Sequence, residues 1–209
     1  ELQEDLFSQY EKKNTQKTSL IKGNELVKIL SPANNFEIPI NSQFEFTLGI
    51  NNDRIRIQSV EISFNGLTQA LEAPYSVLLS TNRMRVGPRT ISILVTDEQG
   101  NKLEKKQSVN LTREKLTYTK VPTIAGIKKN NYGATIEIMY SKRLETPEYI
   151  EFTVKNSKNK IIRKTRMKSP TTFTSFFLPK TNGALLIEIT TKMPGKAAEI
   201  TSQRSYKFQ

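Results

Sequence analysis

The side chains that most often carry catalysis near neutral pH are missing from this 209-residue chain, which contains neither histidine nor cysteine. A Ser-His-Asp triad, a Cys-His pair and a thiolate metal site are therefore excluded. Carboxylate pairs remain as acid and base candidates, but the only aspartates are Asp5, Asp53 and Asp97, and most glutamates alternate outward on expected strands. Ser19 and Lys22 have the Ser-x-x-Lys spacing of penicillin-binding enzymes, yet neither Ser-Asp-Asn nor Lys-Thr-Gly accompanies them. We expect no enzyme and no cofactor.

Two oxygen-rich segments could hold a calcium ion. Asn51-Asn52-Asp53 and Asp97-Glu98 fall at expected loops, where sandwich proteins sometimes bind this metal. Their spacing fits no EF-hand, and turn chemistry alone accounts for Asn and Asp at such positions. We therefore expect no metal site.

Positive charge gathers in the second half of the chain. Residues 1–25 have a net charge of −1, residues 26–112 of +1 and residues 113–209 of +12. Seven basic residues and no acidic one fall within fourteen positions, around a turn expected at Asn156 to Asn159. They are Lys155, Lys158, Lys160, Arg163, Lys164, Arg166 and Lys168. On a strand, Lys164, Arg166 and Lys168 would share one face.

This basic cluster is the candidate binding site. It would attract an acidic protein or an anionic envelope component such as a membrane surface, a wall polymer or a sulfated glycan. Nucleic acid or glycan recognition would need exposed aromatic side chains, for which Tyr132, Tyr140 and Tyr149 are candidates, but no nucleic-acid motif is present. Lys128-Lys129 and Lys142-Arg143 would extend the cluster if their loops lie nearby. The alternative is a solvated face that aids solubility and blocks edge-to-edge aggregation.

Alternating apolar residues predict one-sided strands in the first half of the chain. From Phe44 to Ile50 every second residue is apolar, and Glu45 lies on the outward side of the pattern. Val60 to Phe64 repeats the alternation, and Asn65-Gly66 then supplies the left-handed backbone of a tight turn. Ile57 is out of phase with Val60, which predicts a bulge or loop between them.

Four segments of the first half together resemble bacterial immunoglobulin-like (Ig-like) domains. Such domains open with Ser-Pro-Ala and continue with Val-Glu-Ile-x-x-Asn-Gly, Ala-Pro-Tyr-Ser and a Gly-led strand that runs into Thr-Asp-x-x-Gly-Asn. The corresponding segments here are Ser31-Pro32-Ala33, Val60 to Gly66, Ala73 to Ser76 and Gly87 to Asn101. The resemblance implies a β-sandwich over about residues 27–112, and the family offers no invariant catalytic group to carry over.

The second half also has a β pattern, with a weaker resemblance to a fibronectin type III or Ig-like sandwich. Its expected strands are Thr135 to Tyr140, Ile150 to Val154, Lys160 to Lys168, Phe173 to Leu178, Leu185 to Thr191 and Ala198 to Phe208. We therefore expect an all-β protein of two tandem Ig-like sandwiches, at residues 26–112 and 113–209.

Residues 1–25 differ from the rest of the chain. Leu2, Leu6 and Tyr10 recur at every fourth position, which predicts a short amphipathic helix followed by a polar linker. The helix either packs on the sandwich or binds a partner. No stretch of the sequence reaches the length of a membrane span.

Together these features predict a non-catalytic binding or scaffolding module of an exported bacterial envelope protein. Its location would be the periplasm or the cell surface, and its partner another envelope protein or an anionic envelope component. The alternatives are a structural spacer for an adjacent wall-binding or enzymatic domain, and a glycan- or polyanion-binding sandwich.

Overall fold

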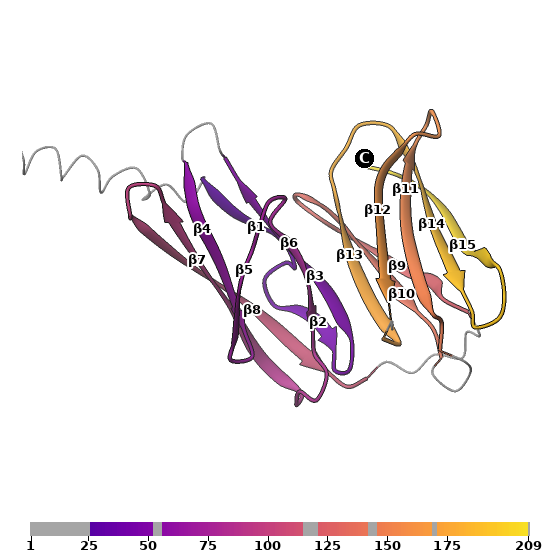
Figure 1. The fold of residues 1–209 in the computed structure, drawn as a ribbon, viewed down its shortest axis with the longest axis horizontal. Helices are drawn as coiled ribbons and strands as arrows, with labels where there is room; N and C mark the ends of the chain where they lie inside the picture. Colours follow the sequence, from indigo (N-terminus) through magenta and orange to yellow (C-terminus); the bar gives the residue numbers. More distant parts are fainter. Residues whose placement is uncertain (1–25, 52–55, 115–120, 142–145, 169–170, 209) are drawn as a thin grey trace, which may run out of the picture.

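A computed structural model of the protein describes residues 26–51, 56–114, 121–141, 146–168 and 171–208 (Figure 1). Within these ranges the regular elements are all β-strands. The expected all-β class is therefore confirmed, whereas the expected helix with Leu2, Leu6 and Tyr10 lies outside the described residues.

The strands of the first half are β1 (Val27–Ser31), β2 (Phe36–Pro39), β3 (Gln43–Ile50), β4 (Ile57–Phe64), β5 (Leu67–Ala70), β6 (Ser76–Ser80), β7 (Gly87–Asp97) and β8 (Lys102–Thr112). Those of the second half are β9 (Thr123–Asn130), β10 (Gly133–Met139), β11 (Tyr149–Asn156), β12 (Ile161–Lys168), β13 (Phe173–Pro179), β14 (Ala184–Lys192) and β15 (Ala198–Lys207).

The first half is a sandwich of two sheets. One sheet has the order β2-β8-β7-β4-β5, and the facing layer consists of β1, β3 and β6. The apolar residues of the expected alternating strands enclose the core between these layers, with Phe44, Phe46, Ile62 and Ile93 almost completely buried. Phe44 and Phe64 meet edge to face, with ring centroids 5.6 Å apart.

Turn chemistry of the first half agrees with the sequence. Asn65 and Gly66 both have positive φ angles, of 52° and 76°, and connect Phe64 directly to its partner Leu67 in a two-residue hairpin. The register between β4 and β7 shifts between Ile57 and Ser59, so the predicted irregularity ahead of Val60 is a β-bulge.

The second half encloses a second core. Its outer sheet has the order β12-β11-β14-β15, and it faces the strands β13, β10 and β9. The core contains a stacked aromatic pair, Phe152 and Phe176, whose ring centroids are 4.7 Å apart, and the inward residues of β10 and β14 surround this pair. Asn156 and Asn159 form the hairpin turn between β11 and β12, as predicted.

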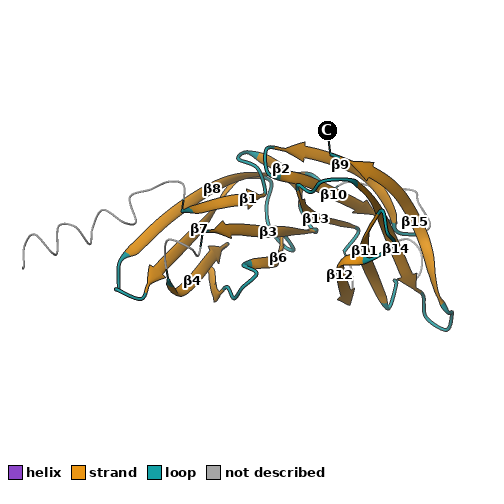
Figure 2. Cartoon of the chain, turned by 90° about the horizontal axis from the view of Figure 1, so that it is seen from above, coloured by secondary structure: helices purple, strands orange, loops and turns teal. Residues whose placement is uncertain are grey.

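One sheet runs through both halves. Its order is β1-β3-β13-β10-β9, with β6 on the other edge of β3, and β3 and β13 are parallel neighbours from opposite halves (Figure 2). The register pairs Ser175 with Phe44, so Phe176 continues on the same face as Glu45. Phe44 belongs to the first core and Phe176 to the second. The two cores therefore lie on opposite faces of the shared sheet.

The second half also receives contacts from loops and strand ends of the first. The side-chain amide of Asn130 donates to the Leu30 carbonyl over 3.1 Å, and the Lys128 ammonium lies 5.1 Å from the centre of the Phe36 ring. Leu78 of β6 packs against the second core. These contacts and the shared sheet join the two halves, while the domain boundary expected near residue 112 stays a prediction.

Candidate functional site

The hairpin of β11 and β12 presents the basic cluster on the outside of the second half. Asn156 orders its turn, because the side-chain oxygen accepts hydrogen bonds from the backbone N–H groups of Lys158 and Lys160 at 3.0 Å each. Along β12 the side chains alternate, so that Lys164, Arg166 and Lys168 are exposed while Met167 enters the core. The outward face expected for these three cations is therefore the observed one.

Glu151 lies beneath two of these cations. Lys164 contacts one of its carboxylate oxygens at 2.9 Å, and Arg166 donates to the other through Nε and Nη2 at 2.9 and 2.7 Å. The Arg166 guanidinium also covers the Tyr149 ring at 4.2 Å. Burial raises the pKa of the Glu151 carboxyl, but the hydrogen bonds and charges of the two cations outweigh it, so the pKa lies below its ordinary 4.5.

The neighbouring strand continues this pattern of cations above carboxylates. Lys155 contacts the buried Glu188 at 2.6 Å, and Lys192 contacts Glu148 at 3.4 Å. We define the basic surface as seven cations on this sheet and its turn: Lys155, Lys158, Lys160, Lys164, Arg166, Lys168 and Lys192. Against them stand three carboxylates, those of Glu148, Glu151 and Glu188. Seven positive and three negative charges leave a net charge of +4.

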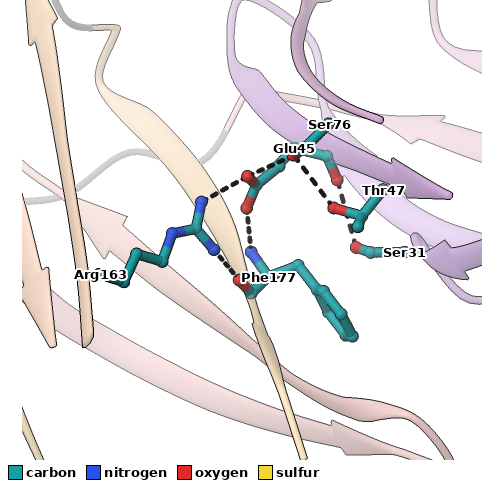
Figure 3. A network of polar contacts seen from close by, with 6 residues as sticks. All are labelled: Ser31, Glu45, Thr47, Ser76, Arg163 and Phe177. Carbon is teal, nitrogen blue, oxygen red and sulfur yellow. Dashed lines mark hydrogen bonds and ion pairs between the residues drawn. The ribbon is translucent and has the colours of Figure 1, made fainter. Parts of the chain in front are cut away.

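Arg163 does not belong to this surface, although the sequence places it in the basic cluster. It points to the opposite side of β12, where its guanidinium pairs with Glu45 of β3 and donates to the Phe177 carbonyl (Figure 3). The guanidinium also lies 5.5 Å from the centre of the Phe152 ring. Its side chain is 22% exposed, and its ion pair with Glu45 connects the two halves.

Glu45 is the acceptor at the centre of this contact. The expectation that it faces solvent was therefore wrong. Its side chain is only 7% exposed, because the second half covers the face of β3 that would be solvated in an isolated sandwich. The carboxylate accepts hydrogen bonds from the Phe177 backbone N–H, from Arg163 and from the Ser76 hydroxyl, the last at 2.6 Å (Figure 3). We call Glu45, Ser76, Arg163 and Phe177 the inter-half network.

A groove of about 1000 Å³ opens beside the inter-half network. Strands β6 and β12 form opposite walls, and the lining combines apolar side chains with the polar groups of the network. Ile162, at 44% exposure, and Phe177 are among the apolar residues, and Lys164 reaches the lining from the basic surface. The groove and the basic surface therefore meet along β12.

The three candidate aromatic residues do not form an exposed cluster. Tyr140 is 2% exposed, and its burial raises the pKa of the phenol to about 12. Tyr149 lies under Arg166, whereas Tyr132 is exposed at the β9–β10 turn. The aromatic face that a lectin-like sandwich would use is thus not assembled from these residues.

The remaining candidates have local structural roles or lie outside the described residues. Asp97 closes the β7–β8 turn by accepting hydrogen bonds from Gln99 and Asn101. Lys128 pairs with Glu137 at 2.7 Å. Asp53, Lys142-Arg143, Ser19 and Lys22 are not among the described residues. In the described ranges, no group of three or more acidic or histidine side chains is arranged to hold a metal ion, and no helix is suited to crossing a membrane.

The sequence offered only a partial signal for the contact of Glu151 with Arg166. The pairing next to the turn, Lys155 with Ile161, would place Glu151 opposite Thr165, and a register shift between Val154 and Lys155 brings it opposite Arg166 instead. The partnership of Glu45 with Arg163 had no such local signal, because the two residues are 118 positions apart.

No protein-family model and no curated protein matches the sequence. Solved structures with a similar arrangement include the fibronectin(III)-like modules of Clostridium thermocellum CbhA, at 15% identity and a TM-score of 0.36, over 86% of this chain and 90% of that one. Latent PorU of Porphyromonas gingivalis is 12% identical, with a TM-score of 0.39, over 89% of this chain and 20% of that one.

Another similar structure is SGBP-B of the Bacteroides ovatus mixed-linkage glucan utilization locus, solved with a mixed-linkage heptasaccharide. It is 13% identical, with a TM-score of 0.32, over 87% of this chain and 47% of that one. The chain thus spans about half of SGBP-B and a fifth of PorU. The CbhA modules are of the fibronectin type that the second half of the sequence resembles. The sandwich fold follows from this chain's own strands and cores.

Proposed function

We propose that the protein is a non-catalytic binding and scaffolding module of an exported bacterial envelope protein, and that the basic surface contacts an anionic partner. In this proposal the chain consists of two Ig-like sandwich domains that meet near residue 112, with a short helix ahead of them. The partner is another envelope protein or an anionic envelope component, and the module works in the periplasm or on the cell surface.

The net charge of the basic surface is the observation that carries this proposal. Two of its three carboxylates, Glu151 and Glu188, are buried beneath the cations that pair with them, so a partner meets mostly lysine and arginine. Lys158, Lys160 and Lys168 have no ion-pair partner among the described residues and are the cations most available for new contacts. A sheet face with such a charge favours long-range attraction of an acidic surface.

Reversing the three available cations tests the proposal. The variant Lys158→Glu/Lys160→Glu/Lys168→Glu leaves every described ion pair in place. The matched control reverses three exposed cations of the first half, Lys28, Arg85 and Lys102, and changes the net charge of the chain by the same amount. Cosedimentation with vesicles of equal parts phosphatidylcholine and phosphatidylglycerol, and capture of acidic proteins from native envelope extract, measure binding.

We expect the basic-surface variant to lose binding and the control to retain most of it. Each lysine near an anionic surface contributes about 1 kcal/mol, so removing three corresponds to a loss of roughly a hundredfold. An equal loss in both variants would mean that total charge matters and the basic surface does not. If the unmodified protein bound neither vesicles nor any envelope protein, the proposal would fail.

The inter-half network favours a second candidate, a structural spacer. Glu45 and Arg163 join the halves through a buried contact, and parallel pairing of β3 with β13 reinforces it. A fixed orientation is what a spacer between other domains requires. A spacer tolerates all the charge reversals above with unchanged function, so the same experiment separates the two candidates.

A further inference from the structure

Two strands on the walls of the groove have an unpaired edge. Among the described strands, β12 pairs only with β11 and β6 only with β3. Figure 2 shows both on the lower, concave side of the molecule. An unpaired strand edge presents a row of N–H and C=O groups that another extended chain can bind.

The groove has the size and lining for such an added strand. Six residues of extended chain, with ordinary strand and sheet spacings, occupy about 1000 Å³, similar to the volume of the groove. Apolar residues of its lining include Leu78, which also packs against the second core, and the half-exposed Ile162. The hydroxyl oxygen of Thr181, also in the lining, is buried and has no hydrogen-bond partner.

The two faces of β12 specify what the added strand should carry. A strand beside β12 would place alternate side chains next to Lys164, Arg166 and Lys168, where acidic residues pair best. Its other side chains would enter the groove on the side of β12 that carries Arg163 and Thr165, toward Leu78 of β6, where apolar residues fit. The required pattern is therefore acidic and apolar residues in strict alternation.

From this geometry we infer that the β12 edge binds an extended segment of a partner protein in which acidic and apolar residues alternate, by adding it as a further strand to the sheet. The inference rests on the proposed function, because it names the partner class of the basic surface. A second copy of the chain does not fit this edge, since pairing β12 with itself would bring cations close to cations. The lysines on this edge repel another basic strand, but they can still pair with an acidic one.

A designed peptide tests the inference on the full chain. The probe is the fluorescently labelled, terminally blocked peptide Thr-Val-Glu-Ile-Glu-Val-Glu-Thr, and its binding is followed by fluorescence anisotropy. One control peptide has the same composition, with its three glutamates grouped together, so that charge is kept and alternation is lost. A second control carries N-methyl groups on the adjacent central Ile and Glu, which removes N–H donors from both edges of the strand.

We expect the alternating peptide to bind at least about tenfold more tightly than either control, since three cross-strand charge pairs and the backbone bonds all depend on strand geometry. Amide hydrogen exchange of Ile161–Lys168 should slow in the complex. Equal binding of all three peptides would overturn strand addition while leaving an anionic site on the basic surface intact. Failure of every peptide and of the anionic vesicles would overturn the proposed function as well.

Discussion

Removing the Glu45 carboxylate should lower the free energy of unfolding more than removing any exposed glutamate does. In Glu45→Ala, the Arg163 guanidinium keeps its partly buried position without its counterion, and the Phe177 N–H loses its acceptor. Breaking a buried ion pair from one side costs about 3–5 kcal/mol, and because Arg163 is 22% exposed, water lowers the value to about 3 kcal/mol. For a protein of this length that corresponds to a fall of about 6–12 °C in Tm.

A surface pair provides the matched control. Arg56 and Glu98 are 3.9 Å apart and both are more than half exposed, so Glu98→Ala should cost less than about 1 kcal/mol. Urea unfolding followed by circular dichroism measures both variants. The apolar double variant Glu45→Leu/Arg163→Met should regain most of the lost stability, because no buried charge is left alone. A Glu45→Ala protein as stable as Glu98→Ala would refute the argument that the inter-half network holds the two halves together.

Three further predictions concern single sites. The folded state lowers the pKa of Glu151, so its ionised form stabilises the fold above pH 4.5. The unmodified protein should therefore be more stable than Glu151→Gln at neutral pH, and urea unfolding should show this difference disappear as the pH falls through the folded pKa. Because the folded state raises the pKa of Tyr140 to about 12, stability should fall between pH 10 and 12, by up to about 3 kcal/mol, and Tyr140→Phe should lose much of this dependence. Gly133→Ala should destabilise the protein by about 3 kcal/mol or more, because a Cβ there would lie 2.1 Å from the Leu178 carbonyl oxygen. In Gly183→Ala the added Cβ meets open space, so this variant should cost only about 1 kcal/mol, for its positive φ. Equal melting temperatures for the two glycine variants would contradict the steric argument.

Local patterns were sufficient to predict many of the strands and turns, but β2, β5, β6 and β9 were not expected. The alternation from Phe44 to Ile50 and the Asn65-Gly66 turn have the expected structure because each depends on neighbouring residues alone. The outward face of Lys164, Arg166 and Lys168 follows from the same two-residue period.

Contacts between the halves could not be predicted in this way. Glu45 has the sequence context of a solvated strand position, and only its neighbours from β12 and β13 make it a buried acceptor. The two-residue period does place Arg163 on the other side of β12 from Lys164 and Arg166, but nothing in the sequence around it indicates that Glu45 is its partner. The parallel pairing of β3 with β13 joins residues about 130 positions apart, and no local signal specifies such a register.

The inter-half network also bears on the inferred peptide site, because it fixes the spacing of the two groove walls. A groove that is already formed spares the partner the cost of ordering it, so loosening the network should weaken binding of the alternating peptide. Glu45→Ala should therefore lower peptide affinity even though Glu45 repels the acidic probe, whereas simple electrostatics predicts the opposite sign. The double variant Glu45→Leu/Arg163→Met separates the causes, since it restores packing without restoring charge. Recovery of peptide affinity in this double variant, measured by anisotropy, would identify groove spacing as the cause. Tighter peptide binding by Glu45→Ala than by the unmodified protein would contradict a role for groove spacing.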